Sequence, residues 1–218
     1  MKPPRYRSLP PCPDGIAQPT SRSGIAPGLG PAEPHQEEDA IEETGCDWRQ
    51  SLIATYPRFF RRGGFPAVGD GWRDLLERAL ARLALALKAG PPEADIGIVQ
   101  IKEKYGTLRL YYDSRSVPER ALAAVEEAVD LAEARSACTC EQCGNEGELH
   151  VRDDWYATCC RDHAQGESVP VKPGWRNLRI VRSYRNGKLV GTSCRRYDRS
   201  RDCFVAAPLP AGLAKEDE

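Results

Sequence analysis

The chain has 218 residues, of which 40% are hydrophobic and 29% are charged, and its formal net charge at pH 7 is −1. This length and composition suit one domain of ordinary size with a small additional module, and they exclude a large multidomain enzyme. The longest apolar segment, residues 79–89, is interrupted by Arg82 and Lys88 and is too short to span a bilayer. We therefore expect a soluble protein without a membrane partner.

Cysteine usage indicates the compartment. The chain contains nine cysteines, an odd number, and no apolar stretch of a secretory signal follows the basic residues 1–7. Reduced thiols fit this pattern better than a disulfide framework does. We expect a cytoplasmic protein.

Charge is distributed unevenly along the sequence. Residues 32–47 contain seven acidic residues and no Lys or Arg, whereas residues 170–201 contain ten basic residues and a single acidic one, Asp198. The two parts of the chain therefore carry opposite charges, which is more informative about partners than the net charge near zero.

The first predicted unit is a tail. Residues 1–44 are rich in Pro, Gly and Ser and show neither a helical nor a strand period, which predicts disorder. The first ordered element is predicted to be a helix that Thr44 or Asp47 caps. Pro57 limits how far this helix can continue unbroken. A second helix is predicted from Asp70 to about Lys88, because its apolar residues recur at helical spacing on one face.

A β-hairpin and a third helix are predicted next. Residues 96–101 and 107–112 are rich in β-branched and aromatic residues, and a turn containing Gly106 separates them. Ser116 and Glu119 then have the spacing of a capping box, with Pro118 in the first turn of a helix that runs to about Ala137. Residues 45–137 are therefore predicted to form an α+β domain, a small layer of helices and a β-hairpin.

Residues 138–166 are predicted to form a zinc-ribbon module. Cys140-x-x-Cys143 is followed after sixteen residues by Cys160-x-x-His163. This spacing is typical of a zinc ribbon or treble-clef site, because each close pair on a tight turn supplies two corners of a tetrahedron. Gly144 suits a knuckle whose backbone takes a positive φ. We expect a structural Zn²⁺ ion, since four protein ligands leave no open position for water.

The same stretch contains further potential ligands. Cys138, Cys159 and His150 can each replace a member of the preferred set, which is the only selection that gives two pairs with the same offset. Cys138 and Cys159 are interpreted as small, partly buried side chains beside the site. Two short strands, 148–152 and 155–158, are predicted to join the two ligand pairs through a turn at Asp153 and Asp154.

Residues 167–205 are predicted to form a basic β-hairpin extension, and residues 206–218 a tail. Asn186-Gly187 is a strong hairpin signal between the predicted strands 178–184 and 189–196. Lys and Arg residues with interleaved aromatic residues suit phosphate contacts and base stacking. The candidate nucleic-acid-binding residues are Lys172, Arg176, Arg179, Arg182, Arg185, Lys188, Arg195 and Arg196.

Five motifs occur together between about residues 46 and 165. They are Tyr56-Pro57, Gly69-Asp70-Gly71-Trp72, Ile101-Lys102-Glu103-Lys104-Tyr105-Gly106-Thr107-Leu108-Arg109, Cys140-Glu141-x-Cys143-Gly144 and Cys160-x-x-His163-Ala164. The combination resembles an uncharacterised family of phage and prophage proteins, of which K-E-K-[FY]-G-x-L-R is the most distinctive string. The resemblance implies the same four metal ligands and a phage or prophage setting, but no activity.

Three functions are compatible with these features. The leading hypothesis is a zinc-stabilised accessory protein that binds nucleic acid through its basic hairpin. The alternative is an adaptor or inhibitor that docks on a host or phage protein through Trp155 and Tyr156 of the zinc module. An enzyme that binds an anionic substrate around Lys102 and Glu103 is the least favoured, because no phosphate loop, nucleophile elbow or HExxH motif accompanies them.

Overall fold

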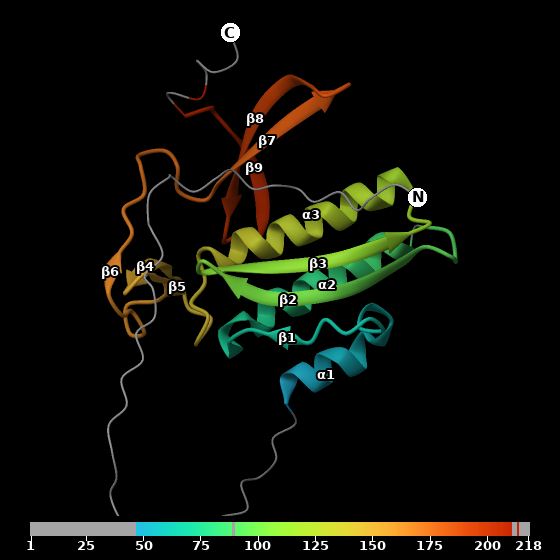
Figure 1. Cartoon of the computed structure of the whole chain (residues 1–218), viewed down its shortest axis with the longest axis horizontal. Coiled ribbons are helices and arrows are strands. Elements are labelled where there is room, and N and C mark those ends of the chain that lie inside the picture. The colour runs from blue at the N-terminus through green and yellow to red at the C-terminus, as the bar shows by residue number, and fades with distance from the viewer. Residues whose placement is uncertain (1–46, 89, 211–212, 214–218) are drawn as a thin grey trace, which may run out of the picture. The chain divides into compact units, whose positions relative to one another are not determined.

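The computed structural model describes residues 47–88, 90–210 and 213. The predicted tail, residues 1–44, and most of the residues after 210 lie outside this range. The described part of the chain is α+β, as predicted, with three α-helices and three small sheets (Figure 1). The helices are α1 (Trp48–Thr55), α2 (Arg73–Lys88) and α3 (Glu119–Ser136). The strands are β1 (Pro66–Ala67), β2 (Asp95–Lys104), β3 (Thr107–Arg115), β4 (Glu148–Arg152), β5 (Trp155–Cys159), β6 (Glu167–Ser168), β7 (Leu178–Arg185), β8 (Lys188–Asp198) and β9 (Cys203–Ala207).

The main core lies between the helices and the first sheet. Figure 1 shows α2 and α3 on one face of the β2–β3 hairpin, and buried side chains from all four elements form one cluster. The predicted apolar face of α2 is buried, and Trp72, in the 3₁₀ turn that precedes it, is fully buried. Asp47 caps α1, because its side chain accepts a hydrogen bond from the Arg49 backbone N–H.

The β2–β3 hairpin is longer than the sequence predicted. The first strand runs on to Lys104 and the second to Arg115, so only Tyr105 and Gly106 remain in the turn, with φ values of 53° and 74°. Positive φ at both central residues is the geometry that joins antiparallel strands most tightly. The short strand β1, which pairs with β2 in parallel, was not predicted, since two residues give no pattern.

The predicted capping box at the start of α3 is wrong. Ser116 has a φ of 51° and lies outside the helix, whose N-cap is Pro118 with no side-chain hydrogen bond. Proline fixes its own φ near −65° and leads into the first helical turn, so the helix begins at Glu119 without a side-chain cap.

The predicted C-terminal hairpin is confirmed, and a third strand completes its sheet. Asn186 and Gly187 form the turn between β7 and β8, with φ values of 51° and 77°. Strand β9 pairs with residues 194–198 of β8, next to the base of the hairpin. We refer to residues 181–191, which extend beyond this pairing, as the arm.

Asp202, in the turn before β9, fastens the C-terminal sheet to the helices. Its carboxylate accepts hydrogen bonds from the Tyr197 hydroxyl at 2.7 Å and from Arg82 of α2 at 2.8 Å. The guanidinium groups of Arg78 and Arg135 lie 3.5 and 3.8 Å from it. Burial raises the pKa of the Asp202 carboxyl, but the hydrogen bonds from Tyr197 and Arg82 outweigh it and hold the pKa below its usual value.

We expect Asp202→Asn to lower the free energy of unfolding at pH 7 by about 2 kcal/mol, because charge-assisted hydrogen bonds are lost in a buried place. A depressed folded-state pKa stabilises the protein above the unfolded pKa of about 3.9, and this stabilisation is lost as the pH falls through the folded value. Urea unfolding should therefore show the full difference in unfolding free energy between the wild type and Asp202→Asn at pH 7. This difference should become smaller below about pH 4. A constant difference would contradict the assignment.

Candidate metal centre

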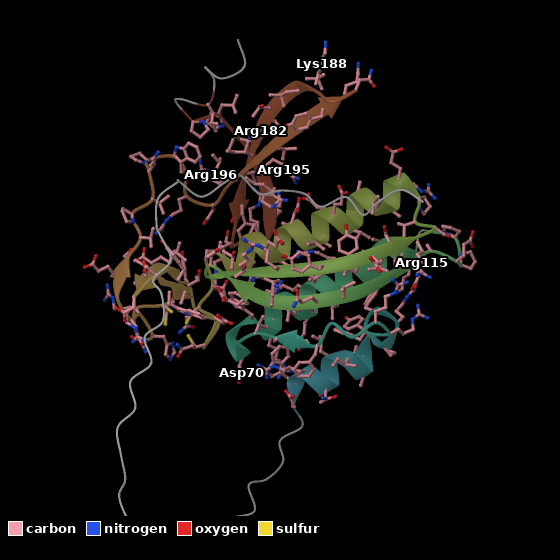
Figure 2. All side chains as sticks on the ribbon, viewed as in Figure 1. Asp70, Arg115, Arg182, Lys188, Arg195 and Arg196 are labelled. Atoms are coloured by element: carbon pink, nitrogen blue, oxygen red, sulfur yellow. The ribbon has the colours of Figure 1, made fainter. Side chains whose placement is uncertain are left out.

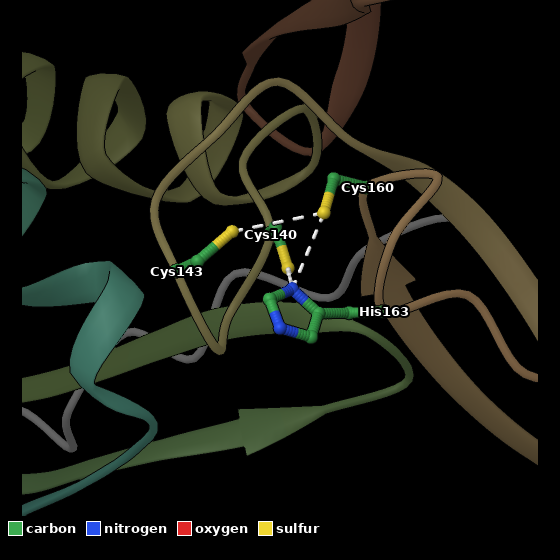
Figure 3. A group of neighbouring side chains, drawn as sticks. All are labelled: Cys140, Cys143, Cys160 and His163. Carbon is green, nitrogen blue, oxygen red and sulfur yellow. Dashed lines mark hydrogen bonds between the residues drawn. The ribbon is translucent and has the colours of Figure 1, made fainter.

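The four predicted ligands lie together in the structure. Cys140 and Cys143 belong to the loop that follows α3, and Cys160 and His163 to the loop that follows β5 (Figure 3). Their ligand atoms all lie within 4.8 Å of one another. They form a Cys₃His group that can hold a metal ion.

The spacing of these atoms suits a tetrahedral ion. The Cys143 and Cys160 sulfurs are 3.6 Å apart, and His163 Nδ1 lies 3.6 Å from Cys140 Sγ and 3.3 Å from Cys160 Sγ. Zn–S and Zn–N bonds of about 2.3 and 2.0 Å in a tetrahedron place two sulfurs about 3.8 Å apart and a sulfur and a nitrogen about 3.5 Å apart. A disulfide would need about 2.05 Å between sulfurs, so the observed separation excludes one and fits thiolates around a shared ion.

The first ligand pair sits on a tight knuckle. The Gly144 N–H donates to Cys140 O at 2.9 Å, the Cys140 N–H donates to Asn145 O at 2.8 Å, and Gly144 has a φ of 80°. Burial raises the pKa of the Cys140 thiol, but backbone N–H groups of the two ligand loops donate to its sulfur and lower the pKa to about 7. The fold therefore favours the thiolate, the form that binds metal.

The hairpin between the ligand pairs forms as predicted. Asp153 and Asp154, with φ values of 51° and 62°, make the turn between β4 and β5. Strand β6 adds a third strand, which pairs with β4. Cys159 is the last residue of β5, so the hairpin delivers Cys160 directly to the site.

The other three potential ligands lie outside the group. Cys138 is buried at the end of α3 against Leu131 and Tyr197, and its sulfur lies 3.3 Å from Arg135 O. Cys159 is buried, and burial raises the pKa of its thiol. His150 is buried in β4, where Nδ1 lies 2.9 Å from Glu148 O. Each has a packing role that is consistent with its exclusion.

The Gly69-Asp70-Gly71-Trp72 motif holds the knuckle against the main core. The Gly71 N–H donates to Glu141 O at 2.8 Å, and the Gly69 N–H donates to the Glu141 carboxylate at 2.9 Å. The buried Trp72 indole donates to Thr139 O at 2.9 Å. The sequence indicated this motif only through its resemblance, and its contact with the metal loop was not predicted.

The K-E-K-Y-G turn contacts the other side of the module. The Thr158 hydroxyl donates to Gly106 O at 2.6 Å, and the Tyr105 and Tyr156 rings meet edge to face with centroids 6.2 Å apart. The Glu103 carboxylate accepts the Gly106 N–H. This contact gives Glu103 a structural task in the turn.

Comparison with family models, with curated proteins and with solved structures found no match for the chain. The identification of the metal group therefore depends on its geometry. No α-helix in the described residues has the length and apolar character needed to cross a membrane.

The basic residues at the base of the C-terminal hairpin are tied to the rest of the molecule. Arg195 makes a bidentate contact with Glu127 of α3, in which Nη1 lies 2.6 Å from Oε2. Arg179 pairs with Asp130, one turn further along the same helix. These contacts fix the hairpin on α3 and use cations that the sequence assigned to nucleic acid.

Other candidate cations also have partners within the chain. Arg196 donates to the carbonyls of Gly174 and Arg176. Arg176 pairs with Glu148 of the metal module at 3.0 Å. The Lys172 ammonium lies 6.0 Å from the centroid of the Trp175 ring.

The remaining candidates lie on the arm. Arg182, Arg185 and Lys188 are exposed. Figure 2 shows Lys188 at the far end of the arm and Arg195 and Arg196 at its base. The structure therefore separates the predicted basic set into cations that hold the hairpin in place and cations that face solvent on the arm.

Proposed function

We propose that the chain is a phage- or prophage-type accessory protein with a structural Zn²⁺ ion, held by Cys140, Cys143, Cys160 and His163. The interatomic distances and the thiolate-favouring knuckle support zinc over harder metals, which prefer oxygen ligands. Four protein ligands fill a tetrahedron, so the ion stabilises the fold and leaves no position for a substrate. The resemblance of its motifs to those of a phage and prophage family supports the setting.

We further propose that this module positions a nucleic-acid-binding arm. The single observation that carries the proposal is the placement of the basic residues: Arg179 and Arg195 at the base of the hairpin are paired with α3, while Arg185 and Lys188 are exposed at the far end of the arm. The exposed aromatic ring of Tyr184 lies on the same arm.

The shape of the arm favours duplex DNA. A two-stranded antiparallel ribbon fits the major groove, which is about 12 Å wide, and lateral cations can then reach phosphates on both sides. The arm is such a ribbon, since β9 pairs with residues 194–198 of β8, outside the arm. The ion pairs to Glu127 and Asp130 would hold it at a fixed angle to the core.

The test is duplex binding by the zinc-loaded protein across a salt series. We expect the triple variant Arg182→Gln, Arg185→Gln, Lys188→Gln to bind more weakly and to reduce the slope of log affinity against log salt by about 2.7, because each lost phosphate contact removes about 0.9. Fluorescence anisotropy of a labelled duplex measures both quantities.

The matched control removes three charges elsewhere, through Lys88→Gln, Arg115→Gln and Arg120→Gln. These residues are exposed and lie outside the arm. The control changes net charge equally, so it separates contact at the arm from general electrostatic attraction. Equal loss of slope in both variants would contradict the proposed contact surface.

A specific observation also favours the adaptor function. Trp155, at the start of β5, is 71% exposed, and tryptophan is a frequent anchor of protein interfaces. A partner captured in high salt after nuclease treatment, and lost with Trp155→Ala, would favour this second function over the first.

A further inference from the structure

The outer face of the β2–β3 hairpin is a second surface of distinctive composition. The helices α2 and α3 cover the opposite face, as Figure 1 shows. Between Gln100 and Lys104 the register places six side chains together on the outer face, and three of them are cations. These residues are Gln100, Lys102, Lys104, Thr107, Arg109 and Tyr111. The carboxylates of Asp95 and Asp113, further along the same face, are paired with Arg61 and Arg62.

Two lysines on this face lie against tyrosine rings. The Lys102 ammonium is 5.5 Å from the centroid of the Tyr111 ring, and the Lys104 ammonium is 5.3 Å from that of Tyr105. Among the described residues no ion pair to a carboxylate is found for either lysine within 4.0 Å. Cations beside aromatic rings are the combination that a surface needs to bind planar anionic groups.

The aromatic character continues beyond the sheet. Tyr105 is 58% exposed at the turn, and its ring meets the edge of Tyr156 in β5. The turn itself is held rigidly, because Gly106 accepts from Thr158 and donates to Glu103. These contacts join two lysines and three tyrosines into one group, which we call the tyrosine–lysine strip and define as Lys102, Lys104, Tyr105, Tyr111 and Tyr156.

We propose that the tyrosine–lysine strip binds single-stranded nucleic acid. Bases would stack on the rings of Tyr105 and Tyr111, and the lysine ammonium groups would contact the adjoining phosphates. In a duplex the base faces are covered by their neighbours, so rings on a flat sheet can reach only unpaired bases. This site is separate from the arm, which contacts duplex phosphates, and it goes beyond the function proposed above.

The test compares two single strands of equal charge. One is an oligothymidylate of about 20 nucleotides, and the other is an abasic strand of the same length. We expect the full-length zinc-loaded protein to bind the oligothymidylate about tenfold more tightly, because only that strand offers bases to stack. Equal affinity for the two strands, or no binding to either at low salt, would overturn the proposal.

Substitutions locate the preference on the strip. The double variant Tyr105→Ala, Tyr111→Ala should lose the preference for the oligothymidylate, whereas Tyr105→Phe, Tyr111→Phe should keep it, since the rings remain. The variant Lys102→Gln, Lys104→Gln should keep the preference but reduce the salt slope by about 1.4, at about 0.7 for each phosphate on a single strand. A double alanine variant that keeps the full preference would place stacking elsewhere.

Two comparisons show that the result does not depend on the stability of a variant or on binding by the arm. The wild-type preference for bases over the abasic strand needs no variant, so it decides whether the protein stacks bases at all, and single substitutions of Tyr105 or Tyr111 locate the stacking if the double alanine protein is unstable. The arm variant should lose duplex binding and retain the base preference, which separates failure of the arm from failure of the strip. A strip that binds a protein partner would give no difference between the two strands, and would contradict the proposal.

Discussion

Cys160→Ser should abolish zinc binding and unfold the metal module while the main core remains folded. The module's described strands β4, β5 and β6 form a small sheet, and its ligands Cys140 and Cys160 are buried side chains that would otherwise be free thiols. Apparent binding energies of structural zinc are about 10–16 kcal/mol in small domains, and this energy stabilises the fold directly. Serine is a poor zinc ligand, so most of this stabilisation is lost.

The main core has enough buried surface to survive the loss. Its cluster contains apolar residues from α2, α3 and the β2–β3 hairpin, together with Phe59, Phe60 and Trp72. The edge that touches the module depends on it, through contacts that include the bonds from Trp72 to Thr139 O, from Thr158 to Gly106 O and from Gly71 to Glu141 O. We therefore expect protection from hydrogen exchange to vanish over residues 138–168 and to persist in α2 and β2.

Cys159→Ser is the matched control, because it changes the neighbouring cysteine, which lies outside the metal group. It should retain one zinc per chain by metal analysis, with a small loss of stability from a buried hydroxyl. Removal of zinc from the wild type with a chelator should reproduce the Cys160→Ser exchange pattern. Retention of zinc by Cys160→Ser, or equal effects of both substitutions, would contradict the ligand assignment.

Local chemistry made most of this site predictable. The C-x-x-C and C-x-x-H pairs, Gly144, and the turns at Asp153-Asp154 and Asn186-Gly187 each depend on near neighbours in the sequence. A tetrahedron or a tight turn constrains residue types over a few positions, so the pattern is visible without tertiary information.

Features that depend on distant partners were not predicted. The sequence gives no sign that Arg195 meets Glu127, because ion pairs across 68 residues leave no local pattern. The contact of Glu103 is local, but a carboxylate that caps its own turn has the same sequence pattern as one that faces a substrate, so the sequence left both roles open. Strand β9 was missed because Cys203–Ala207 is short and lacks alternation.

Gly71→Ala should destabilise the protein through a contact that the sequence did not reveal. A Cβ at this position would lie 2.3 Å from both Cys140 O and Gly144 N and 2.7 Å from Cys143 N. All three are backbone atoms of the metal knuckle, so they cannot rotate away as a flexible side chain would. Overpacking of this kind costs about 3 kcal/mol, and more where backbone must move.

The displacement should also weaken the metal site. The knuckle carries two ligands, and the bond from Gly71 N–H to Glu141 O fixes its position on the core. We expect Gly71→Ala to lower both the free energy of urea unfolding and the zinc affinity measured by competition with a chromogenic chelator. Because apo protein lacks the rigid knuckle, the loss of stability should be smaller once zinc is removed.

Gly191→Ala is the matched control for this prediction. Gly191 lies in β8 on the exposed arm, with no atom within 4 Å of an added Cβ. The same change of residue should therefore be neutral or raise stability by up to about 1 kcal/mol, through the lower entropy of the unfolded chain. If the two alanine variants unfold at the same urea concentration and hold zinc equally, the knuckle does not depend on its contact with Gly71. A difference confined to Gly71→Ala would show that the glycine preceding the buried Trp72 is required because the metal loop packs directly on its backbone.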